Sequence, residues 1–314
     1  MSLEFTGERY VSNLDSPEIS YEHWHRYLYA SKFVGDKVVL DIACGEGYGS
    51  YLLSKTAKKV VGVDIDEKTI RYASGKYVRG NLEFIVGSVD SIPVEGREIF
   101  DVIVSFETIE HVPEDKQEAF LKEVKRLLKK DGLFIVSTPN KLFYSDIPNY
   151  RNEFHIKEFY LDEFRKFLLK FFKNVKLLGQ KIYPVSYIWN VENDSEFSVK
   201  EFRLIKTEQG FRPTDEPKVI LYSIAVCSDS DISEINSSIL VDLSESILKT
   251  RDAYIGSLQT RLSQTEDELA RKTAELEAER QTKTELQTRL SQIEEELARK
   301  TAELEAERQT KTEL

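Results

Sequence analysis

Cysteine, positive charge and long apolar stretches are all scarce in this sequence. Its two cysteines, Cys44 and Cys227, are too few for the disulfide framework of a small secreted domain, and they fit a reducing cytoplasm. The net charge of −11 argues against nucleic acid or an anionic membrane surface as a partner. We find no N-terminal signal region and no apolar run near the ~18 residues of a membrane span. We therefore expect a cytoplasmic protein that would meet the inner membrane only through a partner.

Aromatic residues, proline and glycine are missing from the last part of the chain. All 17 Phe and 15 Tyr lie before residue 255, no proline occurs after residue 241, and the last glycine is Gly256. A packed core therefore belongs to the front of the chain, and the back favours an uninterrupted helix. We divide the sequence into a globular domain (1–228, opening with an N-terminal helical lid over 1–36), a linker (229–240) and a helical tail (241–314).

Three glycines follow one short apolar run near the start of the chain. Val38–Leu40 has the composition of a buried parallel strand, and Gly45, Gly47 and Gly49 come soon after it at a spacing of two. Glycine is needed where the backbone turns sharply and lies against a ligand without a Cβ in the way. An ordinary strand-to-helix turn would use the same glycines, so the residues around them must decide between the two interpretations.

The charged residues near this turn favour a cationic ligand. The next apolar run ends in Asp64, at the distance from Gly45 at which a carboxylate can hold two ribose hydroxyls. The glycine spacing differs from the G-x-G-x-x-G of dinucleotide sites, and Asp41 and Glu46 would repel a pyrophosphate. They would attract a ligand that carries an ammonium and a sulfonium group. S-adenosylmethionine carries both, and we expect it as the cofactor.

From Val38 onward, strand-like and helix-like segments alternate. This alternation is typical of an α/β fold with a parallel sheet, and we predict a seven-stranded, doubly wound (Rossmann-like) sheet followed by a long α-helical coiled coil. The predicted strands are 38–42, 60–64, 82–86, 100–105, 133–137, 175–178 and 219–227. The predicted helices are 20–33, 49–56, 67–77, 113–130 and 161–171.

Polar residues collect at the ends of these strands. Asp41, Asp64, the turn Ser88–Asp90 and the segment Phe106–His111 each follow a different predicted strand. Ligands of doubly wound sheets bind beyond the carboxyl ends of the strands. The four strand ends therefore predict one shared crevice.

Four segments of the front domain resemble those of class I S-adenosylmethionine-dependent methyltransferases. They are 41–49, 61–66, 100–111 and 128–133. The resemblance covers roughly residues 1–228 and is strongest to the small-molecule branch found in bacterial surface-polysaccharide gene clusters. It implies an enzyme that transfers a methyl group from S-adenosylmethionine.

The resemblance also implies roles for single residues. Gly45 and Gly47 would contact the methionine part of the cofactor, and Asp64 would bind the ribose hydroxyls. Ile65 would flank the adenine ring, and Phe106 would lie beneath the cofactor near its methyl group. With Asp41 at the entrance of the glycine turn, these residues form the expected cofactor site.

Two further cofactor contacts are left with alternatives. The family commonly has an acidic residue after the third strand that accepts a hydrogen bond from the adenine amino group. Ser88 stands at that position here, with Asp90 two residues later, so either residue is a candidate. Arg26 either pairs with a ligand carboxylate as part of the lid or belongs to a helix that only caps the core.

The predicted catalytic residues are His155, His111 and Glu107. Histidine suits proton transfer because its unperturbed pKa lies near working pH, and His155 lies in a loop with the aromatic and polar side chains of a carbohydrate site. His111 is the second candidate for the base, with a structural histidine as the alternative. We predict no metal site, since His23 and His25 have no third ligand near them in the sequence.

Residues 183–217 form an insert before the last predicted strand. The insert contains Trp189, Phe197, Phe202 and Phe211. It would either close over the acceptor or pack on the edge of the sheet as a hairpin.

The tail contains an internal repeat. Leu262–Leu286 recurs as Leu290–Leu314, so the period, from position 262 to position 290, is four heptads. Leucines recur at heptad spacing, which predicts a coiled coil, although polar residues such as Lys272 interrupt the seam. A lone charged helix held by i,i+4 ion pairs is the alternative. We expect a homo-oligomer through this tail, and a trimer rather than a dimer.

A methyltransferase head on a repeat-built rod is similar to polysaccharide chain-terminating enzymes. The resemblance implies methylation of a sugar hydroxyl at the non-reducing end of a surface glycan, length control by the rod, and docking on a membrane-associated glycosyltransferase. Two alternatives are a methyltransferase on a quinone-like or other small-molecule acceptor with an assembling tail, and a catalytically inactive scaffold.

Overall fold

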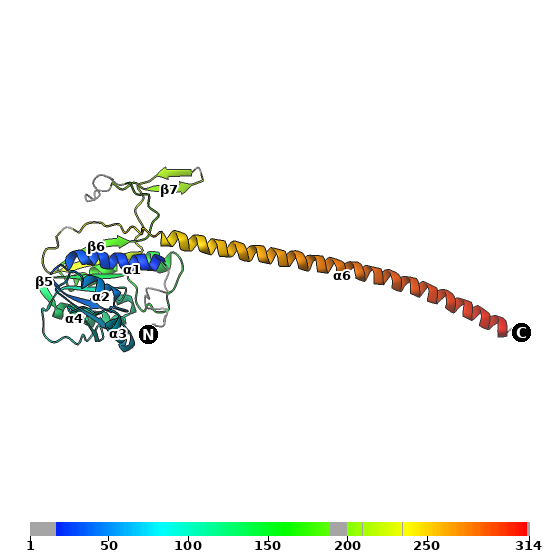
Figure 1. Ribbon diagram of the computed structural model, residues 1–314, viewed down its shortest axis with the longest axis horizontal. Helices are drawn as coiled ribbons and strands as arrows, with labels where there is room; N and C mark the ends of the chain where they lie inside the picture. Colours follow the sequence, from blue (N-terminus) through cyan, green and yellow to red (C-terminus); the bar gives the residue numbers. More distant parts are fainter. Residues whose placement is uncertain (1–16, 189–199, 209, 234, 313–314) are drawn as a thin grey trace. The chain divides into compact units, whose positions relative to one another are not determined.

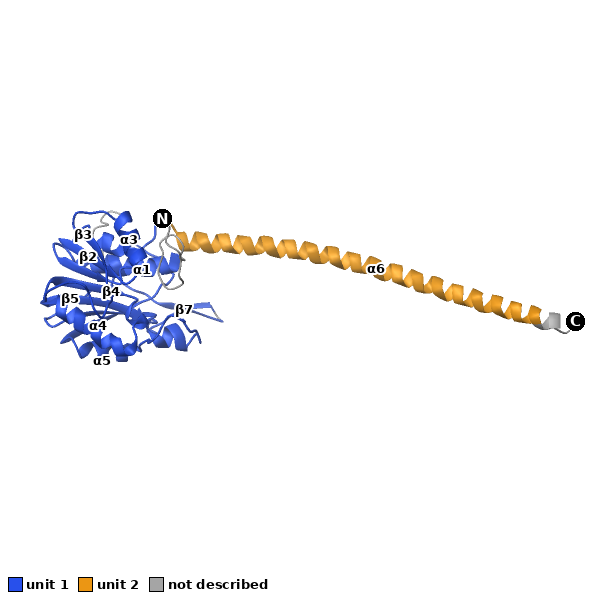
Figure 2. Ribbon diagram, turned by 90° about the horizontal axis from the view of Figure 1, so that it is seen from below, with its two compact units in different colours: residues 1–243 blue, residues 244–314 orange. Residues whose placement is uncertain are grey.

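A computed structural model describes residues 17–188, 200–208, 210–233 and 235–312. The chain forms two compact units, residues 1–243 and 244–314, which are coloured separately in Figure 2 and are treated one at a time below. The first part of the predicted lid (1–16) and the insert residues Trp189 and Phe197 lie outside the described residues.

A seven-stranded sheet forms the centre of the first unit (Figure 1), as the sequence predicts. Its spatial order is β3-β2-β1-β4-β5-β9-β6. The strands are β1 (Val38–Ile42), β2 (Lys59–Asp64), β3 (Leu82–Val86), β4 (Phe100–Phe106), β5 (Leu128–Pro139), β6 (Asn174–Gln180) and β9 (Tyr222–Ser228). The chain runs outward from β1 to β3 and then returns to β4 beside β1. This reversal is the topological switch point at which doubly wound sheets bind ligands.

One strand departs from the expected parallel arrangement. Strand β9 pairs antiparallel with both β5 and β6, so the sheet is mixed. A parallel pairing between β6 and β9 would require a crossover, usually a helix, whereas an antiparallel pairing does not. Local apolar patterns mark the strand but leave its direction undefined.

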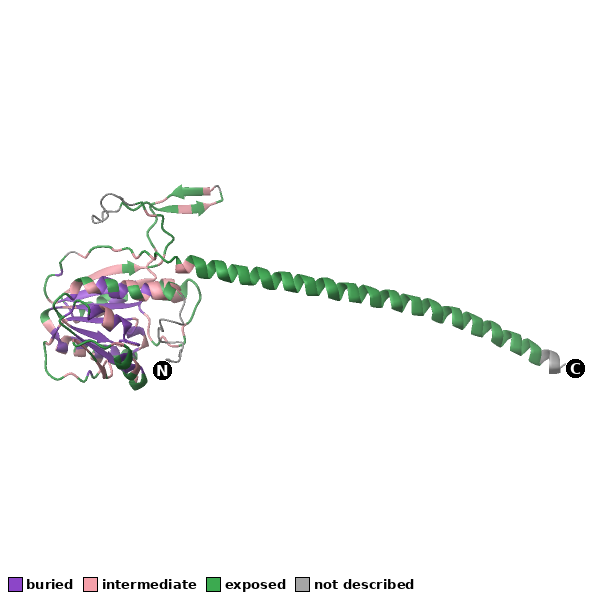
Figure 3. Ribbon diagram, viewed as in Figure 1, coloured by how far each residue is buried: buried purple, intermediate pink, exposed green. Residues whose placement is uncertain are grey.

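Helices cover both faces of the sheet. Along β1 the side chains alternate between two cores. Leu40 and Ile42 pack in the core that contains Phe120 of α4 (Glu114–Leu127), and Val39 packs in the core that contains Tyr27 of α1 (Pro17–Ala30). Figure 3 shows the buried residues concentrated in the sheet and on the inner sides of the helices. The helices are α1 (Pro17–Ala30), α2 (Tyr48–Leu53), α3 (Glu67–Lys76), α4 (Glu114–Leu127) and α5 (Leu161–Leu169), with short turns η1 (Ser31–Phe33), η2 (Ile109–His111) and η3 (Leu142–Asp146).

Helix α4 ends earlier than the sequence predicts. The predicted helix 113–130 stops at Leu127, because Leu128 already pairs with Phe100 as the first residue of β5. Asp131 and Gly132, which directly follow the predicted helix, lie inside that strand. A Cβ on Gly132 would come 2.7 Å from Leu128 Cδ1, so glycine permits this close packing.

The insert before β9 contains a separate two-stranded sheet. Strands β7 (Leu204–Thr207) and β8 (Gly210–Pro213) pair antiparallel. The insert therefore contains a hairpin, and its packing on the edge of the large sheet stays a prediction. Phe202 and Phe211 are exposed, and closure of the insert over an acceptor stays a prediction.

The segment that follows β9 belongs to the first unit. Asp229 forms an ion pair with Lys125, Ile232 is buried, and Ser238 Oγ lies 2.8 Å from His25 Nε2. Most of the segment predicted as a linker is therefore tied to the head.

The second unit is one helix, α6 (Ser246–Thr312). Its repeated leucines, including Leu262, Leu269 and Leu276, are exposed in the single chain. Ion pairs at i,i+4 link Lys272 with Glu268 and Lys300 with Glu296. Association of several tails stays a prediction. None of the helices within the described residues is long and apolar enough to cross a membrane.

Candidate active site

The glycine turn adopts the left-handed backbone that its sequence implies. Positive φ angles occur at Ala43 (58°), Gly45 (54°) and Gly47 (88°). A Cβ on Gly47 would lie 2.7 Å from Phe84 Cζ and 2.8 Å from Ala73 Cβ. The turn therefore needs glycine at position 47 for both its backbone angle and its close packing.

Asp41 lies buried next to this turn. Its carboxylate accepts hydrogen bonds from Ser50 Oγ (2.6 Å) and from the Tyr27 hydroxyl (3.1 Å), and a Cβ on Gly49 would meet the Tyr27 ring at 2.1 Å. Burial raises the pKa of Asp41 to about 7. A cationic ligand nearby would favour the charged carboxylate and lower this pKa again.

Asp64 joins the end of β2 to the glycine turn. One carboxylate oxygen accepts from the backbone N–H of Gly45 and the other from that of Asp66, both at 3.0 Å. These bonds fix the carboxylate at the strand end. Each oxygen has a second lone pair, so Asp64 can also accept from ribose hydroxyls.

The predicted adenine contacts differ in exposure. Ile65 is 73% exposed, which leaves an apolar surface at the end of β2. Ser88 Oγ donates to Asp90, and Asp90 forms an ion pair with Lys116 at 3.1 Å. These hydrogen bonds hold the pKa of Asp90 below its usual value. The two candidates thus act as one bonded pair.

Strand β4 ends in the predicted methyl-proximal residue. Phe106 is buried and packs edge-to-face on Tyr27, with ring centroids 5.0 Å apart. The next residue, Glu107, has a positive φ of 50° and accepts a hydrogen bond from Ser137 Oγ at 2.6 Å. The turn therefore points a carboxylate toward the end of β5.

Arg26 is brought to the same place by α1. Its side chain is 1% exposed, its Nε donates to Gln180 Oε1 at 2.7 Å, and its guanidinium lies 4.5 Å from the Tyr222 ring centroid. Its Nη2 lies 3.6 Å from Glu107 Oε1, in ion-pair range, yet neither terminal nitrogen has a hydrogen-bond partner among the described residues. Burial agrees with a core role, and the unused donors agree with a ligand carboxylate.

Glu110, His111 and His155 come together although the two histidines lie far apart in the chain. One ligand atom from each lies within 4.8 Å of the others, so these three residues could hold a metal ion. The carboxyl of Glu110 is fully buried, and burial with the nearby charge of Glu107 raises its pKa well above the usual value. The histidine rings meet edge-to-face at 5.0 Å.

Both ring nitrogens of His155 have protein partners. Nδ1 lies 2.5 Å from Glu158 Oε1, and Nε2 lies 3.0 Å from Asn152 Nδ2. The imidazole also stacks on the Tyr144 ring, with the two ring centroids 5.3 Å apart. His155 is therefore a firmly oriented side chain.

Several residues near the predicted catalytic residues were not singled out from the sequence. Tyr222 lies under the Arg26 guanidinium, Tyr144 stacks on His155, and Glu22 has its pKa raised to about 7 by burial. Glu158, which contacts His155, could have been recognised from the sequence, because it is a carboxylate only three residues after that histidine. Tyr222 and Glu22 come from distant segments and are recognisable only in the folded chain.

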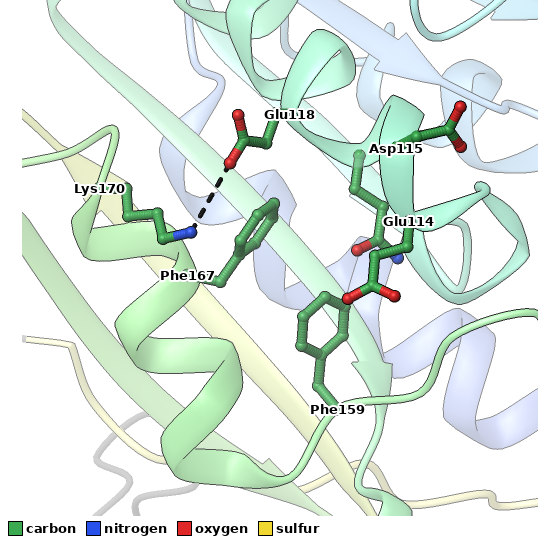
Figure 4. A pocket seen from close by; sticks show the side chains of 7 residues that line it. Glu114, Asp115, Glu118, Phe159, Phe167 and Lys170 are labelled. Atoms are coloured by element: carbon green, nitrogen blue, oxygen red, sulfur yellow. Dashed lines mark ion pairs between the residues drawn. The ribbon is translucent and has the colours of Figure 1, made fainter.

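A separate surface hollow lies between α4 and α5 (Figure 4). Phe159 and Phe167 line it, and Lys170 pairs with Glu118 across it at 3.6 Å. The hollow lies outside the set of predicted site residues, and we assign it no role in catalysis.

Comparison with known proteins gives the family of the sheet domain. A family model for a methyltransferase domain matches residues 40–136. The chain is 34% identical over 163 residues to a probable S-adenosylmethionine-dependent methyltransferase of Mycolicibacterium smegmatis, an alignment that covers 50% of this chain and 60% of that protein. It therefore spans less than two thirds of that relative's length.

Two further similarities are weaker. A ubiquinone biosynthesis O-methyltransferase of Pelagibacter ubique is 33% identical over 107 residues, which is 34% of this chain and 44% of that protein. The solved structure of the YcgJ protein from Bacillus subtilis is 20% identical with a TM-score of 0.48, and the match covers 67% of this chain and 100% of that one.

The family match begins within β1 and includes the glycine turn, Asp64 and β4, which are segments on which the sequence-based prediction of S-adenosylmethionine depends. The prediction of an S-adenosylmethionine-dependent methyltransferase domain agrees with this match and with the relatives, whereas the activity of the whole protein and the roles of the individual site residues stay predictions. The chain carries a class I S-adenosylmethionine-dependent methyltransferase domain, followed by a long helix.

Proposed function

We propose that this protein transfers the methyl group of S-adenosylmethionine to a hydroxyl oxygen of a sugar. The observation that carries the proposal is the set of buried and half-buried polar groups near the end of β4. Glu107, Glu110 and His111 follow Phe106, the predicted methyl-proximal residue, and His155 joins them. Groups that accept a proton are required for a hydroxyl acceptor, because its oxygen becomes a better nucleophile as it loses its proton.

The reaction is an in-line displacement. The acceptor oxygen forms a bond to the methyl carbon, the carbon–sulfur bond breaks with its electron pair left on sulfur, and the hydroxyl proton passes to a base. Holding oxygen and methyl within ~3–3.5 Å in line supplies about 7–11 kcal/mol of the barrier reduction. A well-placed base adds roughly 10²–10⁴-fold.

His155, His111 and Glu107 are the proposed catalytic residues. Glu158 next to His155 Nδ1 favours the proton on that nitrogen and the lone pair on Nε2, where Asn152 now donates. His111 Nδ1 bonds to the Phe154 carbonyl oxygen, which favours the same tautomer. Each imidazole therefore presents Nε2 as the acceptor of a proton.

Aromatic side chains near His155 support a sugar as the acceptor. Tyr144 stacks on His155 and packs edge-to-face on Tyr150, with ring centroids 5.8 Å apart. Its ring centroid lies 5.9 Å from that of Tyr222. Aromatic faces beside carboxylates and hydroxyls can pack on sugar C–H groups and bond their hydroxyls. We propose that the acceptor is the non-reducing end of a bacterial surface polysaccharide.

The repeat-built tail supports a role in assembly and length control. Its leucine seam is exposed in the single chain, and several copies joined through it would bury these side chains. We propose a homo-oligomer, a trimer rather than a dimer, that docks on a membrane-associated glycosyltransferase from the cytoplasmic side. Methylation of the chain end would then stop growth at a length set by the rod.

A quinone-like or other small-molecule acceptor is the second candidate. The similarity to a ubiquinone biosynthesis O-methyltransferase favours it, and the tail would then serve assembly alone. An inactive scaffold is disfavoured, because the glycine turn and Asp64 keep the geometry expected of a cofactor site.

The test is a methyl-transfer assay with radiolabelled S-adenosylmethionine across glycan and quinol acceptors. We expect transfer to a glycan end, and His155→Ala should lower turnover while S-adenosylhomocysteine still binds. Transfer to quinols alone would favour the second candidate. Failure of calorimetry to detect S-adenosylhomocysteine binding would leave only the scaffold.

Length control has its own test in cells. A variant lacking residues 262–289, which form one complete repeat, should make shorter product polymers. A polymer length distribution identical to that of the full chain would contradict the role of the tail as a ruler.

A further inference from the structure

We propose that Glu110, His111 and His155 bind a divalent transition-metal cation beside the predicted methyl-transfer site. One ligand atom from each residue lies within 4.8 Å of the other two. A bound cation would draw these atoms to about 2.0–2.2 Å from itself. The ligands come from η2 and from the loop after β5, so the fold itself assembles the set.

The carboxylate of Glu110 has one oxygen in use and one without a hydrogen bond. Oε2 accepts from Thr138 Oγ1 at 3.0 Å, which fixes the orientation of the group. Oε1 is buried and has no hydrogen-bond partner among the described residues, and it lies 3.9 Å from His111 Nε2. A buried carboxylate oxygen is costly without a partner, and a cation at this point would satisfy it.

Both histidines are oriented as metal ligands usually are. His111 Nδ1 lies 3.0 Å from the carbonyl oxygen of Phe154, and His155 Nδ1 lies 2.5 Å from the carboxylate of Glu158. An acceptor at Nδ1 places the proton there and leaves the lone pair on Nε2. Carbonyl and carboxylate partners of this kind set the tautomer and raise the basicity of metal-binding histidines.

Asn152 holds the position that the cation would take on His155. Its Nδ2 lies 3.0 Å from His155 Nε2, while its Oδ1 accepts from the backbone N–H of Phe154 at 3.0 Å, which fixes the amide orientation. The amide therefore donates to the lone pair. Coordination would replace this hydrogen bond by a metal bond and requires the Asn152 side chain to rotate away from His155.

The donor set selects a class of cation. Two imidazoles and one carboxylate suit zinc, manganese, iron or cobalt, whereas magnesium prefers oxygen ligands. Glu107 interacts electrostatically with Glu110 and adds negative charge, partly offset by Arg26, whose Nη2 lies 3.6 Å from Glu107. Three protein ligands leave positions open for a substrate oxygen.

The role of the cation in the reaction rests on the proposed methyl transfer. A cation that holds the acceptor hydroxyl lowers its pKa, so the oxygen attacks with less help from a base. With Nε2 of His111 and His155 bound to the cation, Glu107, the third proposed catalytic residue, would accept the hydroxyl proton as the carbon–oxygen bond forms and the carbon–sulfur bond breaks. From the sequence we considered only His23 and His25 and predicted no metal site, because neighbours in the chain are visible in a sequence and neighbours in space are not.

The test is a titration of metal-free, full-length protein with Co²⁺, followed by visible absorption. We expect one Co²⁺ per chain, displaced by Zn²⁺ and not by Mg²⁺. Replacing Glu158, the partner of His155, in Glu158→Gln should weaken Co²⁺ binding roughly 10–100-fold. His111→Ala should weaken it further, and His25→Ala, which removes a histidine elsewhere in the head, should leave it unchanged.

Calorimetry with S-adenosylhomocysteine on each variant separates loss of the cation from loss of the fold. Loss of Co²⁺ with retained S-adenosylhomocysteine supports the site, and if His111→Ala fails to fold, Glu158→Gln decides. The proposed metal site is overturned if the natural chain binds no Co²⁺, or if Glu158→Gln and His111→Ala both bind Co²⁺ as tightly as the natural chain does. Full methyl transfer by metal-free protein would remove the cation from the reaction and keep the proposed function. Co²⁺ binding without methyl transfer to any hydroxyl acceptor would keep the metal site and contradict the proposed function.

Discussion

The head and the tail of this chain place their apolar side chains in opposite ways. In the head, Phe120, Leu121 and Phe164 are fully buried. Figure 3 shows the buried residues of the head gathered in its sheet and helices. In the tail, Leu269 is 65% exposed and Leu297 is 64% exposed. The head therefore completes its core within one chain, whereas the tail can bury its leucines only against other chains.

The difference implies two separate sources of stability. The head should fold and bind its cofactor at any protein concentration. The stability of the tail should depend on concentration, because association stabilises a helix that is marginal alone. Four measurements test this contrast between the two units and the predicted cofactor site of the head.

Ending the chain at residue 243, the boundary between the two units, should have the largest effect. We expect an oligomer to become a monomer, since the exposed leucine seam is removed. Analytical ultracentrifugation measures the mass, and calorimetry measures S-adenosylhomocysteine affinity, which should not change. A truncated head that still forms the full oligomer would break the comparison.

Phe120→Ala should lower the free energy of unfolding of the head by about 3–5 kcal/mol, because it leaves a cavity in a closed core. The matched variant in the tail is Leu269→Ala, which should weaken self-association and leave the unfolding of the head unchanged. Urea denaturation followed by tryptophan fluorescence reports on the head. A comparable loss of head stability in Leu269→Ala would show that the two units depend on each other.

Asp64→Asn should weaken S-adenosylhomocysteine binding about 10–150-fold, which corresponds to the ~1.5–3 kcal/mol of a hydrogen bond to a charged group. Glu83→Gln, an exposed carboxylate on the outer strand β3, is the control and should bind normally. Isothermal titration calorimetry gives both affinities. Equal affinities in the two variants would remove Asp64 from the cofactor site.

The affinity for S-adenosylhomocysteine should rise about tenfold between pH 6 and pH 8. Burial raises the pKa of Asp41 to about 7, so the carboxyl is mostly neutral below that pH and charged above it, and the charged form attracts the ligand ammonium. The same shift makes Asp41 lower the stability of the free head as pH rises from about 4 to 7, since the folded state holds the proton more tightly. Asp41→Asn should flatten the affinity profile. An unchanged slope would assign the dependence to another group.

The sequence predicts the strands of the head well because each is a short apolar run followed by a turn. β1 and β3 begin and end at the predicted residues, and Asp41 and Asp64 lie where the strand spacing places them. The direction of β9 cannot be read from the sequence, because pairing partners far along the chain decide it. For the same reason the sequence could not place His111 against His155, or Tyr222 under Arg26.

The heptad pattern of the tail is equally clear in the sequence, yet it does not define how many chains associate. A heptad period of leucines predicts a helix, and the structure has one from Ser246 to Thr312. The number of chains that share the seam depends on side-chain packing between copies, which a single chain does not contain.

The repeat in α6 also bears on how the length of this protein can change. One unit, from position 262 to the start of the next at position 290, is a whole number of heptads, so adding or losing a unit in the gene leaves the leucine stripe continuous. Each such event would lengthen or shorten the helix by about 42 Å. Relatives with tails of different reach can therefore arise in single genetic steps, without any new packing solution.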